Sequence, residues 1–401
     1  MLSVTEAQAL INQRAKPLAP VVTDLTPGAL GLVLAEAVAS DLDMPPYDKA
    51  LMDGYAARAA DLSNGQATLE IVDEVTAGHT PKRSVGSGQA IRIMTGAPIP
   101  EGADAVVMIE RTRLLENSRV RIDDRPGRAG QNVLPRGKEM RKGDTVLHAG
   151  SLLRPQEFGL LSSVGRTRAK IHPRPEVAIL PTGDELVEPS EMPGPGQIRN
   201  SNGPMLAAQV QRAGGIPHSV GIGRDRPDHL RSLIAEGLRH SMLILSGGVS
   251  AGKLDLVPGI LEELGVGPHF HKVEMKPGKP VFFGTRGETL VFGLPGNPVS
   301  SLVCFELFVR PAIRLLAGHK NAGPLMVQAR LADEFAYRTD RPTYHPAWLD
   351  CGPDGWQVRA VPWFGSSDLR GLTQANAFVL FPAGDGRHQA GQPFAVLKVE
   401  D

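Results

Sequence analysis

The sequence predicts a multidomain protein of the α/β plus β class, and three observations support this prediction. Its 401 residues suffice for two to four domains, each with its own core. Residues 176–317 alternate short apolar runs with amphipathic segments, as strands and helices do in turn. Short β-like runs dominate before and after that region, and the 45 Gly and 34 Pro residues separate them as turns.

The N-terminal part predicts a helical domain that is interrupted in sequence. Ser3 and Glu6 fit a capping box, and a Thr-Pro pair at 26–27 precedes an apolar stripe over 30–34, so residues 3–40 are expected to be helical. Helical character returns at 154–165. The domain is therefore placed at 1–44 and 144–175. It carries a β-rich insertion at 45–143, with strands at LEIVDEV, QAIRIM, AVVMIE and RVRID.

The remaining chain predicts two further domains. At 176–318, the strand-like runs VAIL, HSVGIG, MLILSG and LVFGL alternate with the helix-like segments SNGPMLAAQVQRAGG, PDHLRSLIAEGLRH, LDLVPGILEELG and PVSSLVCFELFVRPAIRLLAG. This alternation predicts a three-layer α/β domain with a mostly parallel sheet and helices on both faces. At 324–401, MVQARL, WQVRAV, AFVLFPAG and FAVLKVE predict a small β-barrel-like domain.

Composition excludes several classes of function. Lys plus Arg equals Asp plus Glu at 43 each, which gives no sign of an electrostatic partner such as nucleic acid or an anionic membrane. No apolar run reaches the roughly 20 residues of a transmembrane helix, and the first residues lack the pattern of a signal peptide, so we expect a cytoplasmic protein. Cys304 and Cys351 indicate neither a disulfide framework nor a cysteine metal site.

A glycine-rich turn after one predicted strand indicates a phosphate site. The segment MLILSGGVSAGKLD, residues 242–255, turns from an apolar run into glycines and then a helix, whose N-terminus carries about half a positive charge. Gly247 to Lys253 also fits seven positions of the P-loop pattern, but Leu254 stands where a P-loop has the hydroxyl that binds Mg²⁺. A P-loop-like nucleotide hydrolase therefore remains an alternative, which measurable ATP turnover by the protein alone would support.

Acidic and basic residues gather at the predicted strand ends. Glu185, Asp225 and Asp255 are expected at the carboxyl edge of the sheet, where they would repel one another unless a divalent cation such as Mg²⁺ lies between them. The lysines of HKVEMKPGKP, at 272, 276 and 279, add positive charge for an anionic substrate. Together these groups predict metal-assisted chemistry at a phosphate or a related oxyanion.

Seven segments in order resemble the motifs of one family. They are PPYDKALMDGYA, RIMTGAPIPEGADAVV, PTGDEL, GRD, SGGVSAGKLD, KPGKP and LPGNPVS. Their order along almost the whole chain is similar to that of the molybdopterin molybdenumtransferases, the MoeA family, which includes the gephyrin E domain. The resemblance implies that the α/β domain binds molybdopterin. It also implies Mg²⁺-assisted insertion of molybdate into adenylylated molybdopterin, with release of AMP.

The resemblance also implies roles for individual residues. The catalytic positions are Asp53, Thr95, Glu185, Asp225, Asp255, Lys272 and Lys276, and the metal ligands among them are Glu185, Asp225 and Asp255. The substrate-binding positions are Ser246, Gly247, Gly248, Val249, Ser250, Lys279, Pro295, Gly296, Asn297, Pro298 and Glu139. The implied assembly is a homodimer with sites shared between subunits. Molybdopterin adenylyltransferase and apo-molybdoenzymes are the implied partners.

Several positions depart from the family pattern. Glu139 stands where many relatives have Asp, and Arg226, Asn200 and Lys253 stand where many have an acid. His345 and Pro346 occupy the place of an arginine that is often seen in the last domain. These changes make the expected site less acidic and bear on metal affinity and oxyanion preference.

Two other interpretations stay open at this point. The single motifs also fit ordinary structure: Asp53-Gly54 fits a turn pair, LPGNP a rigid turn and the lysines a solvated loop. A non-catalytic molybdopterin-binding or scaffolding protein could also carry this fold. Retention of the acids and lysines favours the enzyme.

Overall fold

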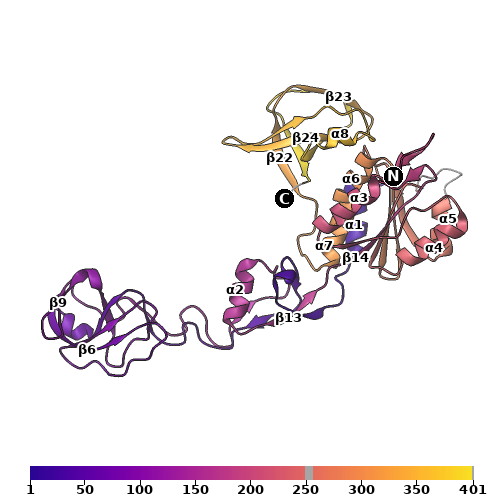
Figure 1. Ribbon diagram of the computed structural model, residues 1–401. Coiled ribbons are helices and arrows are strands. Elements are labelled where there is room, and N and C mark those ends of the chain that lie inside the picture. The colour runs from indigo at the N-terminus through magenta and orange to yellow at the C-terminus, as the bar shows by residue number, and fades with distance from the viewer. Residues whose placement is uncertain (249–255, 400–401) are drawn as a thin grey trace. The chain divides into compact units, whose positions relative to one another are not determined.

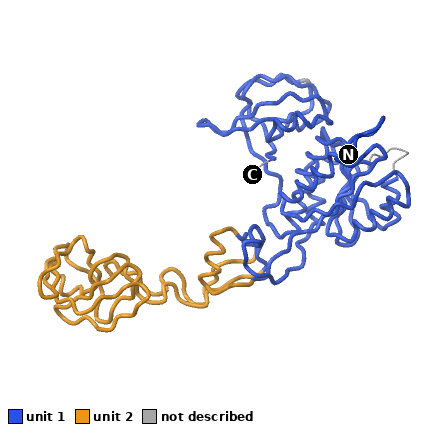
Figure 2. Tube along the Cα trace, in the orientation of Figure 1, with its two compact units in different colours: residues 1–35, 150–153, 169–401 blue, residues 36–149, 154–168 orange. Residues whose placement is uncertain are grey.

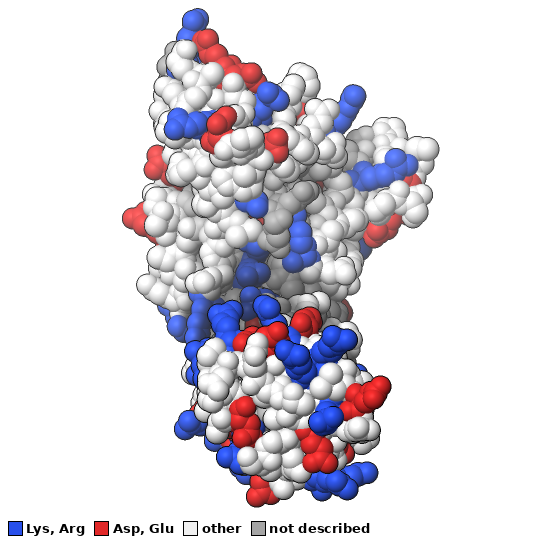
Figure 3. Space-filling view, turned by 90° about the vertical axis from the view of Figure 1, so that its left-hand side faces the viewer, with Lys and Arg blue, Asp and Glu red and all other residues white. Residues whose placement is uncertain are grey.

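The computed structural model describes residues 1–248 and 256–399. The chain divides into two compact units (Figure 2), one of residues 1–35, 150–153 and 169–401 and the other of residues 36–149 and 154–168. On the face shown in Figure 3, basic and acidic side chains are interspersed, in keeping with their equal totals.

The smaller unit is built around a six-stranded sheet in the order β8-β5-β7-β6-β10-β9. The strands are β5 (Gly54–Ala57), β6 (Gln66–Val75), β7 (Gln89–Ile93), β8 (Ala105–Met108), β9 (Thr112–Leu115) and β10 (Arg119–Asp123). The unit also contains two separate two-stranded pairs, β4 (Lys49–Ala50) with β11 (Val133–Leu134) and β3 (Val38–Ala39) with β12 (Thr145–Leu147). The short helices are η2 (Ala59–Leu62), η3 (Ile109–Arg111) and α2 (Pro155–Ser163). The four β-runs and the helix predicted here are confirmed.

The predicted helix over 3–40 is wrong beyond its first part. Helix α1 (Val4–Arg14) begins at the Ser3–Glu6 capping box, but residues 15–40 contain no α-helix. They form β1 (Val21–Asp24), the single turn η1 (Pro27–Ala29) and β2 (Val33–Leu34), and both strands flank β13 (Arg168–His172). Gly31 at φ +78° ends the local helical path, and Leu34 N–H bonds Ser151 O instead. Long-range strand pairing thus overrides the local apolar stripe.

The larger unit contains the α/β domain, whose sheet has the order β17-β14-β18-β21-β20-β19. Its strands are β14 (Glu176–Pro181), β17 (Ile216–Ser219), β18 (Met242–Ser246), β19 (Gly267–Lys272), β20 (Pro280–Arg286) and β21 (Thr289–Leu294). The first four in this spatial order run parallel, whereas β20 pairs antiparallel with both β21 and β19, so β20 alone of the six strands runs in the opposite direction. The mostly parallel sheet is confirmed. Strands β19 and β20 were not predicted from the sequence.

Helices cover both faces of this sheet, as the three-layer prediction requires (Figure 1). One face packs against α1, α3 (Asn202–Arg212), α6 (Pro298–Cys304) and α7 (Arg310–Leu316), and the other against α4 (Pro227–Gly237) and α5 (Leu256–Glu263). No helix in the described part of the chain is long and apolar enough to cross a membrane.

A π-helical turn, η4 (Phe305–Val309), joins α6 to α7 at a proline. Pro311 has no N–H for the carbonyl of Leu307, four residues earlier, and the side-chain amide of Gln8 in α1 donates to that carbonyl at 3.1 Å. Glu306 in the same turn is buried and accepts from Gln209 at 2.8 Å and from Arg212. Burial raises the pKa of Glu306, against the attraction of these partners.

The C-terminal strands form a closed barrel in the order β22-β25-β24-β26-β28, which confirms the barrel-like prediction. Its strands are β22 (Met326–Leu331), β24 (Thr343–Gly352), β25 (Gly355–Ala360), β26 (Ala377–Phe381) and β28 (Pro393–Lys398). A hairpin of β23 (Phe335–Thr339) and β27 (Gly384–His388) and a short helix α8 (Leu369–Leu372) complete this part of the chain.

Candidate active site

A cavity of about 720 Å³ opens at the carboxyl ends of β14, β18 and β21. This is the edge of a parallel sheet where ligands bind in doubly wound folds. The cavity carries two carboxylates, and we call it the acidic cavity. Of the predicted site residues, Glu185, Asp225, Ser246, Gly247, Gly248, Pro295, Gly296, Asn297 and Pro298 line it.

Backbone geometry explains the glycine turn that follows β18. Gly247 has φ +92°, and a Cβ atom on it would lie 2.5 Å from the carbonyl oxygen of Thr182. Its N–H donates to Leu294 O at 3.1 Å, which ties the turn to the end of β21. Only glycine fits here without displacing the neighbouring strand end. The described turn stops at Gly248: Val249, Ser250, Lys253, Leu254 and Asp255 lie outside the described residues.

The two acids of this cavity stand on neighbouring loops that Arg224 holds together. The Arg224 guanidinium donates to the carbonyls of Leu186 at 2.7 Å and Asp184 at 3.1 Å, and the N–H of Asp225 donates to the Asp184 carboxylate at 3.0 Å. These bonds bring the loops after β14 and before α4 side by side. Within residues 1–248 and 256–399, neither the Glu185 nor the Asp225 carboxylate has a cationic partner. Both are thus available to a ligand or a metal ion.

Asn202, at the start of α3, is a cavity residue that the sequence analysis missed. Its side-chain N–H₂ donates to Ser246 Oγ at 2.8 Å and to Gly296 O at 2.6 Å, so it joins two of the phosphate-site segments. Its Oδ1 is buried and has no hydrogen-bond partner in the described part of the chain. A buried polar atom beside a cavity is an acceptor that a ligand can satisfy. An asparagine at a predicted helix start gave no signal beyond capping.

Asn200, which departs from the family pattern, stabilises the start of helix α3. It is buried, and its Oδ1 accepts from Gly203 N–H at 2.9 Å within the first turn of α3. The amide therefore fixes the start of this helix. An ionised acid at this position would meet the same N–H and add charge to the cavity.

The LPGNP segment connects the acidic cavity with a second one. Asn297 donates to Ser366 Oγ at 2.8 Å, and Val299 N–H donates to Ser366 O at 3.0 Å. Ser366 belongs to the segment between β25 and α8. Both cavities are lined by Pro280, Pro295 and Asn297, so they are neighbours.

The second cavity measures about 490 Å³ and carries three basic residues, Lys276, Lys279 and Arg341. We call it the basic cavity. Lys276 is held by its backbone, since its N–H donates to Pro342 O at 2.9 Å and its carbonyl accepts from Tyr344 N–H at 2.7 Å. The Lys276 ammonium lies 5.4 Å from the ring centroid of Tyr337. Two predicted lysines thus lie in one cavity, whereas Lys272, at the end of β19, lines neither.

The barrel supplies the residues of this cavity that sequence reasoning missed. Arg341 pairs with the carboxylate of Asp340, and this hydrogen bond lowers the pKa of Asp340. The indole N–H of Trp363 is buried and without a hydrogen-bond partner among the described residues. His345, noted as a departure from the family, packs edge-on against Tyr337 and Trp363. Burial lowers the pKa of His345 to about 4, so it is neutral at pH 7 and adds no charge behind the lysines.

The three remaining predicted residues belong to the smaller unit. Asp53 precedes β5 and Thr95 follows β7, and Asp53 Oδ1 accepts from both the N–H and the hydroxyl of Thr95, each at 2.7 Å. These bonds, the backbone one first, lower the pKa of Asp53. Glu139 pairs with Lys49 at 3.4 Å. Asp53 and Thr95 therefore form one local pair, and Glu139 belongs to another.

Family models match three successive parts of the chain. The MoeA N-terminal region, domains I and II, matches residues 2–165, a probable molybdopterin binding domain matches residues 178–315, and the MoeA C-terminal region, domain IV, matches residues 328–399. Together they cover most of the sequence.

Individual relatives agree with these models over the full length. The molybdopterin molybdenumtransferase of Nostoc sp. is 39% identical over 381 residues, covering 92% of this chain and 87% of that protein. The molybdopterin molybdenumtransferase of Staphylococcus aureus is 33% identical over 409 residues, covering 100% of this chain and 96% of that protein. A crystal structure of the moeA molybdopterin biosynthesis protein from Pyrococcus horikoshii superposes with a TM-score of 0.83 at 29% identity, covering 99% of this chain and 100% of that one. The chain therefore belongs to the MoeA family of molybdenum cofactor biosynthesis proteins, the family of the molybdopterin molybdenumtransferases.

Proposed function

We propose that this protein is a molybdopterin molybdenumtransferase that inserts molybdate into adenylylated molybdopterin with the help of Mg²⁺ and releases AMP. The observation that supports this most is the pair of neighbouring cavities, one with a glycine turn and free carboxylates and the other with three cationic side chains. The substrates have complementary chemistry, a phosphorylated pterin nucleotide and a small oxyanion.

The acidic cavity is suited to the phosphorylated part of the pterin nucleotide. Gly247 and Gly248 line this cavity, where their backbone is available to a phosphate, and Ser246 lines it beside them. The unpartnered Oδ1 of Asn202 can accept from a ligand donor. These groups bind and orient the nucleotide, which is the main contribution that a protein makes to reactions at phosphorus.

The donors in this cavity fit Mg²⁺. Glu185 and Asp225 offer carboxylate oxygens from adjacent loops without cationic partners in the described residues, and Mg²⁺ prefers such ligands. By resemblance, Asp255 is the third acid. When bound, Mg²⁺ supplies charge neutralisation at the phosphate oxygens as AMP leaves. Glu185 and Asp225 would hold this ion beside the glycine turn.

The basic cavity is suited to molybdate, which carries two negative charges. Lys276, Lys279 and Arg341 can donate hydrogen bonds to its oxygens, and charge-assisted bonds of this kind are the strong ones. The backbone of Lys276 is also held by hydrogen bonds, which limits the conformational entropy that is lost on binding. Because the two cavities share part of their lining, an oxyanion in one lies beside the pterin nucleotide in the other.

The experiment that tests this function measures products directly. Purified protein is incubated with adenylylated molybdopterin, Mg²⁺ and molybdate, and AMP and the finished cofactor are quantified. We expect both products in equal amounts, with tungstate compared in parallel. Tight pterin binding without any AMP release would contradict the proposal and favour the scaffolding alternative.

One variant and a matched control test the role of the basic cavity. Lys276→Ala should raise the molybdate concentration needed for half-maximal rate by at least tenfold while changing pterin-nucleotide affinity little. Lys16→Ala, which removes an exposed lysine of α1's C-terminal flank, serves as the matched control. Equal effects of both substitutions would contradict the assignment of the basic cavity.

We also propose the assembly that the family resemblance implies. The protein forms a homodimer with shared sites, receives its substrate from molybdopterin adenylyltransferase and passes its product to apo-molybdoenzymes in the cytoplasm.

A further inference from the structure

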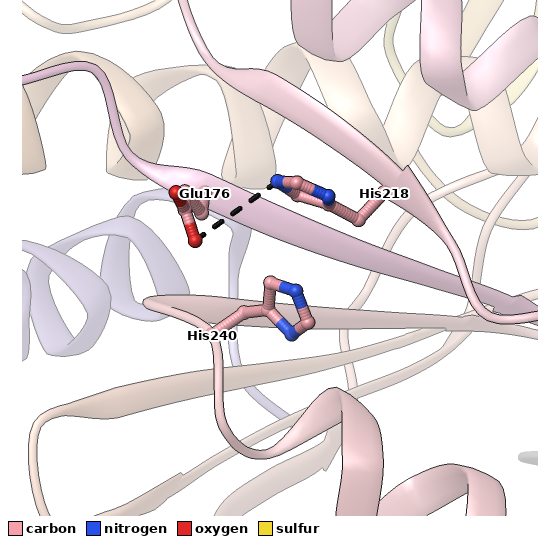
Figure 4. Close-up of side chains that lie close together, drawn as sticks. All are labelled: Glu176, His218 and His240. Atoms are coloured by element: carbon pink, nitrogen blue, oxygen red, sulfur yellow. Dashed lines mark ion pairs between the residues drawn. The ribbon is translucent and has the colours of Figure 1, made fainter.

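We infer that this protein has a second metal site, a zinc-type site formed by Glu176, His218 and His240 at the amino-terminal edge of the α/β sheet. The three side chains converge from two strands and one connecting loop (Figure 4). The proposed reaction uses the opposite, carboxyl edge of the sheet. This inference therefore does not depend on the proposed function.

The sheet register brings the first two ligands together. Glu176 begins β14, and His218 on the parallel strand β17 lies opposite Ala178. Side chains along a strand alternate between faces with a period of two, so Glu176, Ala178 and His218 point to the same face. Ala178 belongs to the core under α4 and α5, which identifies that face.

The connection between α4 and β18 supplies the third ligand and is held in place from behind. The Thr289 hydroxyl donates to His240 O at 3.1 Å, and Leu290 N–H donates to Ser241 O at 3.2 Å. The Nδ1 of His240 lies 3.3 Å from the carbonyl of Gly237, the last residue of α4. If Nδ1 carries the proton for this bond, Nε2 remains as the metal-binding nitrogen. A ligating histidine is oriented in this way in most metal sites.

The distances between the three ligand atoms are slightly longer than those around a bound metal ion, so the side chains would move closer together on binding. One ligand atom from each residue lies within 4.8 Å of the other two, and His218 Nε2 is 4.0 Å from Glu176 Oε2. At bond lengths of about 2.0–2.1 Å, a tetrahedral zinc ion separates its ligand atoms by about 3.4 Å. Glu176 is 58% exposed in its side chain and can make up the difference by rotation.

The unsatisfied nitrogen of His218 favours a ligand over a plain ion pair. Its Nε2 atom is buried and forms no hydrogen bond with any described residue, because 4.0 Å from the nearest carboxylate oxygen is too long. The ring centroids of His218 and His240 are 4.8 Å apart at an interplanar angle of 41°, and one ring nitrogen of each lies within 4.8 Å of the other. A bound cation would satisfy this nitrogen.

The donor set identifies the class of ion. Two imidazoles and one carboxylate suit Zn²⁺ and its neighbours in the first transition series, whereas Mg²⁺ prefers oxygen ligands only. Three protein ligands at a partly exposed edge leave a fourth position for water. The site should therefore bind Zn²⁺ in the presence of excess Mg²⁺.

The test is Zn²⁺ titration of tag-free full-length protein by calorimetry, with Mg²⁺ in excess. We expect one Zn²⁺ per chain. His218→Ala and His240→Ala should each weaken binding by at least tenfold, since loss of even an outer partner of a metal ligand costs about 10–100-fold. His148→Ala, which removes an exposed histidine of the other unit, is the matched control and should bind like the original protein.

A fourth variant, Glu176→Gln, keeps the inference testable if a histidine variant fails to fold, because Glu176 is exposed at the strand end. Circular dichroism checks the fold of each variant. Absence of saturable Zn²⁺ binding, or equal affinity in the folded variants and the control, would overturn the inference. AMP release should be the same in His240→Ala as in the original protein, so the result leaves the proposed reaction to its own test.

Discussion

At the scale of single residues, the acids of the acidic cavity lie on two loops that the Arg224 side chain joins, and neither carboxylate forms an ion pair within the described residues. Asp225 follows Arg224, whose guanidinium is occupied by three carbonyls of the neighbouring loop. Positive charge is thus used to connect two loops, and the acids beside it remain unpaired in the described structure. Their negative charge is therefore not neutralised by a described side chain, as the proposed Mg²⁺ site requires.

The first prediction concerns Asp225→Asn, a nearly isosteric change. Removing one preorganised charge of an active site typically costs about 10²–10³ in rate, or roughly 2.7–4 kcal/mol, and we expect this loss in Mg²⁺-dependent AMP release. Glu188→Gln, an exposed change in the loop that follows Glu185, is the matched control. AMP release by Asp225→Asn at the rate of this control would refute the role of the acid.

The second prediction concerns the pair of Asp53 and Thr95. Thr95→Val removes the hydroxyl but leaves the backbone N–H, the larger cause of the lowered pKa, so the pKa of Asp53 should rise only part of the way to its ordinary value of 3.8. A lowered carboxyl pKa contributes stability above the unfolded-state pKa, and this contribution is lost as the pH falls through the folded-state pKa. The variant should therefore lose less stability on acidification.

Carboxyl-carbon NMR titration measures this pKa directly, and acid unfolding curves measure its consequence. Thr145→Val, an exposed strand position in the same unit, is the control. An unchanged Asp53 titration in Thr95→Val would show that the hydroxyl does not act on the carboxylate.

Sequence reasoning found the residues whose motifs are local and missed those that only the fold brings in. Glu185, Asp225 and the glycine turn each follow a strand end, and parallel strands end at one edge, so their convergence was predictable. Arg341 comes from the barrel and Asn202 from a helix start. Neither has a local pattern that places it at a cavity, because tertiary packing decides where it lies.

At the scale of elements, hydrophobic periodicity predicted one region correctly and another wrongly. The four parallel strands and the helices of 176–317 repeat a strong period and were predicted, whereas β19 and β20 in the same range were missed. Residues 15–40 have an equally apolar stripe, but Gly31 and the distant partner β13 turn it into strands. The local pattern of apolar residues contains no information about a strand that pairs from more than 130 residues away.

The third prediction compares two glycines near the phosphate turn. Gly247→Ala would force a Cβ to 2.5 Å from Thr182 O at φ +92°, and we expect a cost of about 1–3 kcal/mol in the free energy of unfolding. Gly259→Ala, inside α5 with no atom within 4 Å of its added Cβ, should gain about 0.5–1 kcal/mol. Urea unfolding measures both, and a destabilised Gly259→Ala with a neutral Gly247→Ala would contradict the described turn.

At the scale of the whole molecule, the division into two units carries the fourth prediction. The proposed homodimer shares its sites between subunits, with Asp53 in one unit and Asp225 in the other. Asp53→Asn and Asp225→Asn chains, each inactive alone, should form hybrids with one intact site of two. Random mixing makes about half of the dimers hybrids, so activity should return to roughly a quarter.

Subunit exchange is verified by native mass spectrometry of the mixture. If verified hybrids stay inactive, each site is built within one chain. A monomer in solution would remove the dimer proposal altogether.

The docking of α1 has a consequence for the order in which the chain folds during its synthesis on the ribosome. Gln8 in α1 bonds the carbonyl of Leu307, a partner 299 residues further along the chain, and Leu18 N–H bonds the carbonyl of Leu316. The smaller unit, in contrast, draws only on residues 36–168 and is complete before the α/β domain emerges. Helix α1 is therefore synthesised long before the residues it docks against, and it docks only after they have emerged. Until then, the apolar side chains of α1 are exposed to solvent unless the nascent chain or a chaperone binds them.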